Sequence, residues 1–494
     1  MLELNRLRAL SSILVLLVLA GCGPAPMPSP TSVVPASPTA VISPSPTAMI
    51  PLSPTPVPPT PVVPVLPTVP PPLPTPAPSI SGDPRFGAVF FSTKLNITDL
   101  PCAELQKMGV HSTFFGAWWG LLEPQNGQYD WGSVDGPVDA ALACGVEPVI
   151  KITTAAGPGK DAMPPEDIEA YSNFVFELAQ HLKGRVRVYA IENELDNQRM
   201  AGWTAEVYAP VRAAAYQAIH RADADAWVLD CGLTMGAYLM ARADELRQAG
   251  RAEEAVAMLG RFQQFIRRKE ASLPDSEKRL SQWLGSPNAL RSVDLVKEMV
   301  AHPETYDAVQ LHYLQDAWEL IPEYIGWVRS WQPDKQVEFW EIGFGWEGEQ
   351  FTEKGHANGV VKTLVSALGE GAGRVIYEPY WEQTGANAQA KKFGRGLMTP
   401  DGSRLAATAY QTMASQLSGY QKAERLDVGP GVWAYRFVTP RGDVYVVWAN
   451  SAGTVRLPLP ATQVVVTDIT GSTMTATAAS LPVSTSPVFV SAGE

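Results

Sequence analysis

The sequence predicts an α/β fold, a (β/α)8 TIM barrel followed by a small C-terminal β-sandwich domain. From about residue 84, short apolar runs rich in β-branched and aromatic residues alternate with amphipathic helical stretches, which is typical of parallel βα units. Eight such runs precede residue 421, and eight units close a barrel. Beyond about residue 422 the helical patterns stop and alternating apolar runs follow, as expected for antiparallel strands. We therefore assign residues 83–421 to the barrel and 422–494 to the β-sandwich.

Each barrel strand is predicted from an apolar run that a turn or a helical pattern bounds. Apolar residues at helical spacing fill the intervals, for instance over Pro165 to Leu182 and Ala205 to Ala222. The predicted strands are, in order, Gly87 to Phe91, Val110 to Phe115, Glu147 to Thr153, Val186 to Asn193, Trp227 to Cys231, Asp307 to Tyr313, Gln336 to Glu341 and Arg374 to Trp381.

An oversized insertion separates the fifth and sixth predicted strands. It covers about residues 235–302 and is rich in Ala, Glu, Arg and Leu, so we predict that it is helical. We expect it to overhang the carboxyl ends of the strands as a lid or as the wall of a subsite. The C-terminal domain is predicted from five alternating runs, two of which the turn Arg441 to Asp443 joins as a hairpin. These runs are Val432 to Val438, Val444 to Trp448, Thr454 to Leu459, Val464 to Asp468 and Val488 to Val490.

Residues 1–22 have the pattern of a targeting signal. Arg6 and Arg8 precede an apolar run over residues 10–20 that is too short to span a bilayer comfortably. The run ends in Leu-Ala-Gly-Cys, which resembles the lipobox of bacterial lipoproteins and implies that Cys22 carries a diacylglycerol and is the mature N-terminus. An ordinary secretory signal with an incidental cysteine is the alternative. Residues 23–82 are rich in Pro, Ser and Thr, so we expect a disordered tether that holds the folded part on the extracellular side of the cell envelope.

Charge and cysteine spacing restrict the partners and cofactors. Lys plus Arg number 38 against 50 Asp plus Glu, a net charge of -12, so the surface should repel nucleic acid, although a solvated acidic surface explains the same imbalance. Cys102, Cys144 and Cys231 lack metal-ligand or redox spacing, and we predict three buried thiols, with one disulfide and one free cysteine as the alternative. The sequence has no nucleophile elbow, phosphate-binding loop, zinc-protease helix or dinucleotide-binding turn. We expect a monomer with no metal and no cofactor.

Two glutamates stand where a barrel places its reactive side chains, at the carboxyl ends of strands. The fourth predicted strand runs into Glu194, and the seventh ends at Glu341. Carboxylates on roughly opposite sides of the barrel mouth can straddle a sugar, where one protonates the leaving oxygen and the other attacks or stabilises the anomeric carbon. Either glutamate alone would more often be a solvated rim charge, but the pair in register predicts cleavage of a glycosidic bond. Lys151 and Glu378 could line the mouth as well, and salt-bridge roles are equally expected for them.

Asn193 and Glu194 after the fourth strand, together with Glu341 at the end of the seventh, resemble the residues that define the clan A glycoside hydrolases. The resemblance covers roughly residues 84–420. It implies that Glu194 is the acid/base, that Glu341 is the nucleophile and that the anomeric configuration is retained. It also implies that Asn193 hydrogen-bonds the 2-hydroxyl of the sugar.

Further residues fall where that clan has substrate-binding groups. The segment that begins at Trp119 is similar to the one after the second strand, and because Trp118 and Trp119 are adjacent only one can face the lumen, for which we favour Trp119. His312 and Tyr313 resemble a region whose aromatic hydroxyl positions the nucleophile, although a lone histidine is more often a core residue. Trp381, after the eighth strand, resembles the platform on which a sugar ring stacks.

Three residues depart from the clan pattern. Glu192 and Leu195 stand where the clan usually has Trp and Pro, and Trp340 stands where a small or hydroxylated residue is common. Glu192 either pairs with Arg187 or Lys151 as a structural residue, which we favour, or raises the pKa of the acid/base by charge repulsion. These departures concern the sugar and the linkage more than the chemistry.

The sequence thus predicts a retaining O-glycoside hydrolase that acts on extracellular poly- or oligosaccharides. One alternative is a surface lipoprotein that binds glycans without cleaving them, and the presence of both carboxylates argues against it. The other is a transglycosylase that uses the same pair, which depends on the shape of the acceptor site.

Overall fold

A computed structural model of the 494-residue chain describes residues 80–90, 100–265, 272–315, 317–343, 351–382, 396–399, 401–459 and 461–493. The predicted signal peptide with Cys22, and nearly all of the predicted tether, lie outside the described residues. Among the helices that the structure describes, none is both long and apolar enough to cross a membrane.

Eight parallel strands close into a barrel, which confirms the predicted fold class. Neighbours in the ring follow the order β5-β4-β3-β2-β1-β9-β8-β7, and the pairing of Leu229 in β5 with Ala308 in β7 closes it. A short strand, β6 (Leu233–Thr234), also pairs with β7. The ring strands are β1 (Phe86–Ala88), β2 (Ser112–Trp118), β3 (Glu147–Thr153), β4 (Val188–Ile191), β5 (Trp227–Leu229), β7 (Ala308–Leu314), β8 (Gln336–Gly343) and β9 (Arg374–Tyr377).

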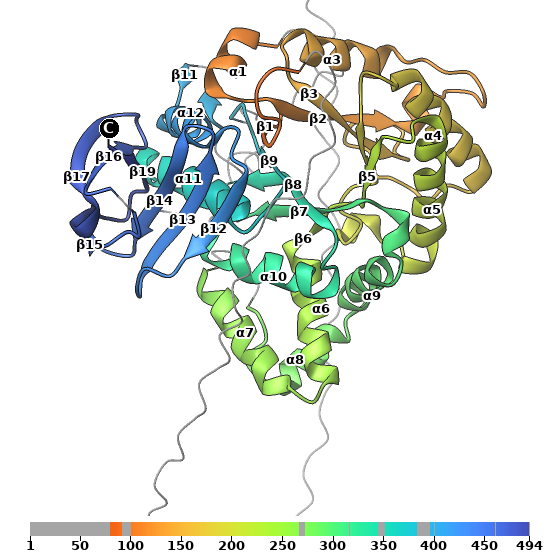
Figure 1. The fold of residues 1–494 in the computed structure, drawn as a ribbon. Coiled ribbons are helices and arrows are strands. Elements are labelled where there is room, and N and C mark those ends of the chain that lie inside the picture. Colours follow the sequence, from red (N-terminus) through yellow and green to blue (C-terminus); the bar gives the residue numbers. More distant parts are fainter. Residues whose placement is uncertain are drawn as a thin grey trace, which may run out of the picture. The chain divides into compact units, whose positions relative to one another are not determined.

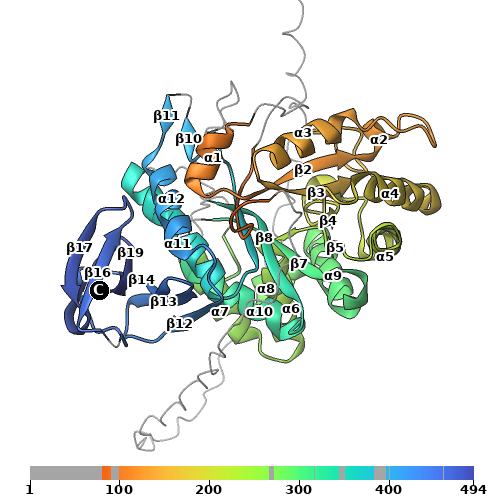
Figure 2. The same ribbon diagram turned by 45° about the horizontal axis from the view of Figure 1, so that its top comes forward.

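Helices surround these strands (Figure 1, Figure 2). Helix α4 illustrates why they form: Asp167 caps its first turn by accepting from Ala170 N, and one apolar face with Tyr171 and Phe174 is buried. The helices outside the insertion are α1 (Cys102–Met108), α2 (Trp119–Leu122), α3 (Gly132–Ala143), α4 (Ile168–Leu182), α5 (Ala205–Ala222), α10 (Ile321–Trp331), α11 (Glu353–Gly369) and α12 (Leu405–Leu417), and a small hairpin of β10 (Met398–Thr399) and β11 (Gly402–Ser403) precedes α12.

The barrel lumen is filled by every second side chain of the strands. Its buried apolar members are Val89, Val149, Val188, Ala190, Leu229, Ala308, Trp340 and Ile376. At the amino ends of the strands, the buried guanidinium of Arg374 contacts Glu147 at 2.6 Å and Glu338 at 3.1 Å. Because successive residues of a strand face opposite sides, this lumen set determines which side chains point towards the barrel mouth.

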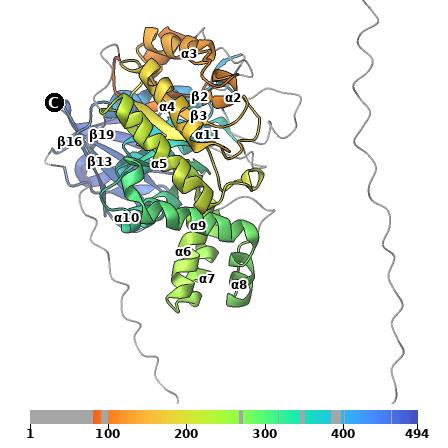
Figure 3. The same ribbon diagram turned by 90° about the vertical axis from the view of Figure 1, so that its right-hand side faces the viewer.

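The insertion is attached to the helical shell and extends beyond it (Figure 3). It consists of α6 (Met235–Gln248), α7 (Ala252–Phe265), α8 (Glu277–Leu284) and α9 (Pro287–Ala301), and α6 lies beside α7 and α9 (Figure 3). Tyr238 of α6 packs on Tyr324 of α10, and Glu298 of α9 accepts two hydrogen bonds from Arg212 of α5. Helices α6 and α9 contact the shell helices α10 and α5, and α7 reaches α10 through Phe262 and Trp327, whereas α8 packs on α7 and α9. In Figure 3, α7 and α8 project away from the barrel.

The cysteines follow the alternative pattern. Cys102 and Cys144 form a disulfide between the start of α1 and the end of α3, and Cys231 is a buried free thiol. The prediction of three thiols was wrong, because residues far apart in sequence meet where two neighbouring shell helices approach each other.

The C-terminal region forms antiparallel sheets, as predicted. A six-stranded sheet has the order β12-β13-β14-β19-β16-β17, and β15 pairs with β18. All five predicted runs contain strands, and the predicted hairpin joins β13 to β14. Three strands were not predicted, because β12 and β17 are largely polar and β18 is short and contains Pro482. The strands are β12 (Lys422–Leu426), β13 (Val432–Thr439), β14 (Gly442–Ala449), β15 (Gly453–Val455), β16 (Gln463–Asp468), β17 (Thr473–Thr477), β18 (Leu481–Val483) and β19 (Val488–Ala492).

Candidate active site

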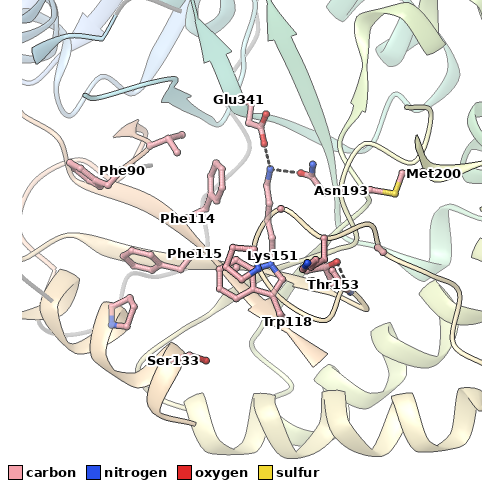
Figure 4. A pocket seen from close by; sticks show the side chains of 18 residues that line it. Phe90, Phe114, Phe115, Trp118, Ser133, Lys151, Thr153, Asn193, Met200 and Glu341 are labelled. Atoms are coloured by element: carbon pink, nitrogen blue, oxygen red, sulfur yellow. Dashed lines mark hydrogen bonds and ion pairs between the residues drawn. The ribbon is translucent and has the colours of Figure 1, made fainter. Parts of the chain in front are cut away.

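A pocket of about 440 Å³ opens at the carboxyl ends of the strands, a volume within the usual range of roughly 300–1,000 Å³ for small-molecule sites. Phenylalanine and tryptophan rings from the β1 and β2 segments form its apolar side, and Lys151, Asn193 and Glu341 form its polar end (Figure 4). None of the described lining residues comes from the α6–α9 insertion. The expectation that the insertion is a lid or a subsite wall is therefore wrong for this pocket, because no described residue of its helices reaches the lining.

Glu341 reaches the pocket because β8 is irregular just before it. The register between β7 and β8 shifts after Phe339, so that His312 pairs with Glu341 and Trp340 is an extra residue in β8. A bulge of this kind changes the alternation of side chains by one position. Trp340 fills the lumen and stacks on Phe114 with 6.3 Å between ring centroids, and Glu341 also turns inward.

Lys151 links Glu341 to Asn193 at the polar end of the pocket. Its Nζ donates to Glu341 Oε1 at 2.5 Å and to Asn193 Oδ1 at 2.6 Å, and the two dashed contacts meet at this nitrogen in Figure 4. The ammonium also lies 4.0 Å from the centre of the Phe114 ring, within the range of a cation–π interaction. Lys151 is only 4% exposed, so its charge acts on Glu341 with little screening by water.

This environment keeps Glu341 ionised. Burial alone would raise the pKa of Glu341, but the charges of His312 and Lys151, with hydrogen bonds from Lys151 and Glu378, lower it to about 2. Glu378, which follows β9, has the opposite state: burial and the adjacent Glu341 carboxylate raise its pKa well above the usual range. The raised pKa favours the protonated Glu378 carboxyl, the form that can donate a hydrogen bond to the Glu341 carboxylate.

The end of β4 has an uncommon backbone. Glu192 and Glu194 have φ angles of 70° and 46°, a conformation that costs energy in residues other than glycine and persists where the surroundings fix it. Glu192 N donates to Ile152 O at 2.8 Å, and Glu194 N donates to Cys231 O at 2.8 Å. The neighbouring strands β3 and β5 thus hold a turn that directs Asn193 into the pocket.

Glu192 is a buried structural carboxyl. Its Oε1 accepts from Thr154 N at 2.8 Å, and burial raises its pKa to about 7 although hydrogen bonds from Thr154 and Thr153 act in the opposite direction. Of the two partners considered from sequence, Lys151 is engaged with Glu341 and Asn193 instead. The predicted Glu192–Lys151 pair is therefore wrong.

His312 lies between the two glutamates. Its Nδ1 is 2.9 Å from Glu194 Oε1 and 3.4 Å from Glu341 Oε2, and its Nε2 is 3.2 Å from Gln310 Oε1. Gly232 makes room for the ring, because a Cβ at this position would lie 2.4 Å from Nε2. The imidazole therefore brings the two predicted catalytic carboxylates to one nitrogen atom.

The same three side chains are the candidate metal ligands among the described residues. One ligand atom from each of Glu194, His312 and Glu341 lies within 4.8 Å of the others. The Lys151 ammonium is 2.5 Å from Glu341 and 3.4 Å from His312 Nε2. Because a fixed positive charge already neutralises this cluster, the arrangement favours acid–base chemistry over cation binding.

The prediction that Trp119 rather than Trp118 faces the lumen was wrong. Strand β2 continues to Trp118, three residues beyond its predicted end, and Trp118 lines the pocket. Trp119 begins α2, where its indole donates to Glu123 at 2.6 Å and packs on Tyr171 of α4. Gly116 allows this arrangement, because a Cβ there would lie 2.6 Å from the Trp118 ring.

Tyr313 and Trp381, the other two aromatic residues predicted at the site, do not contribute to the described pocket lining. Tyr313 follows His312 in β7 and therefore faces the helices, where its hydroxyl donates to Ala317 O at 2.5 Å and its ring lies near Tyr324. The expectation that its hydroxyl reaches the nucleophile is thus not met by any described contact. Trp381 follows β9 and is 36% exposed, but it does not belong to the described pocket lining, so its role as a sugar platform stays a prediction.

For Lys151 and Glu378 the sequence left two roles open, lining of the mouth or a salt bridge, and did not connect either residue with Glu341. The available signal for Lys151 was its position in the apolar run of β3, where it shares a face with Val149 and Thr153. A charge at an inward position of a buried strand is expensive unless it is paired, which marks it as a residue with a partner. Glu378 follows β9 directly and had no comparable signal, because its contact with Glu341 depends on barrel closure.

Solved structures that resemble this chain share its fold. A family 39 glycoside hydrolase from the gut symbiont Bacteroides cellulosilyticus WH2 has a TM-score of 0.59 at 13% identity, with 83% of this chain and 81% of that chain covered. A glucosidase from Croceicoccus marinus has a TM-score of 0.52 at 12% identity, with 83% and 97% covered. No protein-family model and no curated protein sequence matches this chain. At these identities the likeness concerns the fold alone.

Proposed function

We propose that this chain is a retaining O-glycoside hydrolase that cleaves poly- or oligosaccharides outside the cell. Glu341 is the nucleophile and Glu194 is the acid/base. The observation that carries the proposal is the pair of carboxylates that meets at His312 beside an aromatic-walled pocket, with Glu341 held ionised by Lys151.

The separation of the carboxylates supports a double displacement. One oxygen of Glu194 lies within 4.8 Å of one oxygen of Glu341. Retaining enzymes hold the two carboxyl groups about 5–5.5 Å apart, whereas inverting enzymes need roughly 6.5–9.5 Å to admit a water. The short distance leaves the nucleophile, rather than a water, facing the anomeric carbon.

The reaction follows from these positions in two steps. First, the Glu341 carboxylate attacks the anomeric carbon while the bond to the leaving oxygen breaks and Glu194 donates its proton to that oxygen. Next, Glu194 as a carboxylate takes a proton from water, whose oxygen attacks the same carbon while the bond to Glu341 breaks. Both glutamates return to their starting states, and one water has been added across one glycosidic bond.

The neighbouring side chains have roles that fit this chemistry. Lys151 keeps Glu341 ionised and occupies Asn193 Oδ1, so Asn193 Nδ2 can donate to a sugar hydroxyl beside the reacting carbon. The Trp118 ring offers an apolar face for the C–H face of a pyranose. The likeness in fold to a glycoside hydrolase and to a glucosidase agrees with this reading.

We place the enzyme at the cell envelope, anchored by a lipid on Cys22. The Cys102–Cys144 disulfide supports export, because disulfides persist mainly in oxidising compartments. The protein should therefore partition with membranes, and Cys22→Ser should release it without a change in activity. A wild-type protein recovered entirely from the medium would contradict the anchor.

Azide rescue of two variants tests the catalytic roles. Glu341→Gly should lose turnover on every substrate, and azide should restore cleavage with an inverted product, since azide enters from the face of the missing nucleophile. Glu194→Ala should still react in the first step with dinitrophenyl glycosides, whose leaving group needs no proton, and azide should then give a retained product. The stereochemistry is read by NMR of the glycosyl azides.

The outcomes separate the alternatives. Retained azide product from Glu341→Gly together with inverted product from Glu194→Ala would mean that the roles are reversed. Full activity in either variant would put the catalytic centre elsewhere. A wild-type protein that binds oligosaccharides but releases no sugar from a panel of aryl glycosides and polysaccharides would support a glycan-binding lipoprotein, and products longer than the substrate would identify a transglycosylase.

A further inference from the structure

We propose that Arg291, on helix α9 of the insertion, is a positioning residue for Glu194: it holds the loop of residues 195–200 in the conformation that aims the acid/base at the leaving group. The inference rests on the proposed function. It also gives the helical insertion a task that the sequence did not predict.

The contacts of Arg291 are concentrated on one short stretch of main chain. Its two terminal nitrogens donate to four carbonyl oxygens of the loop that directly follows Glu194, and one of them also donates to a side chain on α9 itself. The acceptors are Leu195 O, Met200 O at 2.9 Å, Asp196 O at 3.0 Å, Asn197 O at 2.8 Å and Asn288 Oδ1 at 2.8 Å.

This use of an arginine differs from that of the buried Arg212 and Arg374. Arg212 and Arg374 pair with carboxylates, whereas the acceptors of Arg291 among the described residues are all neutral oxygens. The planar guanidinium presents its donors in a fixed fork, so it fixes the relative positions of several carbonyls at once. A loop held in this way has little freedom to change its backbone angles.

A second contact from the insertion reaches the same loop. The Asp196 carboxylate accepts from Thr234 N at 3.2 Å and from Thr234 Oγ1 at 2.5 Å, and Thr234 immediately precedes α6. The start of the insertion and its last helix therefore both bind the segment after Glu194. Within the loop, Asn197 N donates to Glu194 O at 2.9 Å, which links the bound segment to the acid/base itself.

The backbone of Glu194 explains why such support is needed. Its φ of 46° is unfavourable for a residue with a side chain. The N–H of Glu194 is fixed by Cys231 O on one side, and the Arg291 contacts fix the chain on the other. Without Arg291 the loop can relax, and a displacement of about 1 Å at a catalytic group can cost on the order of 100-fold in rate.

The inference predicts different losses for different substrates, because Glu194 acts as an acid only on leaving groups that need a proton. Arg291→Ala should lower kcat/KM for a phenyl glycoside by about 10- to 100-fold, while a 2,4-dinitrophenyl glycoside should lose less than about threefold. A merely structural role would lower both alike. The slope of log kcat/KM against leaving-group pKa should therefore become steeper in the variant.

The experiment uses the full-length protein and a series of aryl glycosides, from phenyl through 4-nitrophenyl to 2,4-dinitrophenyl, of the sugar that the wild type cleaves. Arg247→Ala is the matched control, since Arg247 lies on α6 in the same insertion and pairs with Asp244. Its slope should equal that of the wild type. Arg291→Lys keeps the charge but not the fork, so it should show the same selectivity in weaker form, and it supplies the comparison if the alanine variant folds poorly.

Two results would overturn the proposal in distinguishable ways. An active wild type whose Arg291 variants lose activity equally on all leaving groups, or lose none, would remove the positioning role alone. A wild type that cleaves no glycoside of the panel would overturn the proposed function and this inference with it.

Discussion

The two proposed catalytic glutamates belong to different strands of one barrel, Glu341 near the end of β8 and Glu194 in the turn after β4, and the chain supports them by different means. Glu341 is held from inside the barrel by side chains, with the Lys151 ammonium at 2.5 Å and the His312 ring at 3.4 Å. Glu194 has His312 at 2.9 Å as a side-chain contact, and its backbone is held by Cys231 on one side and by the loop that Arg291 binds on the other. Only His312 contacts both carboxylates among the described residues.

The difference corresponds to what each group has to do. A nucleophile must start ionised, and positive neighbours stabilise that state. An acid/base must both give and take a proton, so a fixed charge beside it would favour one of its two states. Among the described residues, Lys151 pairs with Glu341, whereas no lysine or arginine pairs with the Glu194 carboxylate. The site thus separates control of ionisation, at the end of β8, from control of geometry, at the end of β4.

The largest effect is expected from removing the charge beside Glu341. Lys151→Met should lower kcat/KM on the order of 100- to 1,000-fold, as the loss of a preorganised electrostatic contact does in other active sites. Because Lys151 is one of the groups that depress the pKa of Glu341 to about 2, its removal should raise that pKa. The acid limb of the pH–rate profile should then move to higher pH.

The pH profile distinguishes this electrostatic role from lost packing. Lys151→Arg keeps a positive charge and should move the acid limb less than Lys151→Met does. Lys297→Met, which removes a half-exposed lysine of α9 paired with Asp244, should leave the profile unchanged. An acid limb that stays in place in Lys151→Met would show that Lys151 does not control the ionisation of Glu341.

The comparison also shows what the sequence could predict. Alternating apolar and amphipathic segments gave all eight barrel strands, and both glutamates were found because barrels expose the carboxyl ends of their strands. Asn193 and His312 were brought to the site for the same reason. These predictions depend only on local patterns and on closure of the ring.

The sequence was less informative where a single residue shifts the alternation of inward and outward side chains along a strand. Strand β2 extends to Trp118, so Trp118 shares the inward face with Phe114 and Gly116 while Trp119 leaves the strand. In β8 the extra residue Trp340 lets both Trp340 and Glu341 face inward, and although Glu341 was predicted at the site, no sequence pattern marks the bulge that puts it there. The support of Glu194 by the insertion was also missed, because it depends on how α9 packs beside the barrel.

A milder effect is expected at the neutral carboxyl beside the nucleophile. Glu378 has a pKa raised well above the usual range by burial and by the Glu341 charge, so glutamine reproduces its neutral, hydrogen-bond-donating state. Glu378→Gln should therefore keep activity within about tenfold at neutral pH, whereas Glu341→Gln should be inactive. Parallel kinetics of the two variants on one aryl glycoside provide the measurement. Equal losses would show that Glu378 also takes part as an ionised group.

The smallest effect on catalysis is expected at Glu192, a carboxyl at the β4 end whose pKa is raised by burial. Its pKa of about 7 in the fold exceeds the ordinary 4.5, so the folded state binds a proton that the unfolded state releases, and wild-type stability falls as pH rises from about 4.5 through 7. Glu192→Gln cannot ionise, and it should gain up to roughly 3 kcal/mol over the wild type between pH 4.5 and 8 with little change in kcat. Asp230, whose pKa is also about 7, is present in both proteins and cancels in the difference. Urea unfolding of both proteins across this pH range measures the gain. A stability difference that does not change with pH would mean that Glu192 is ionised in the fold. The β4 end would then, like the β8 end, be organised around a charge.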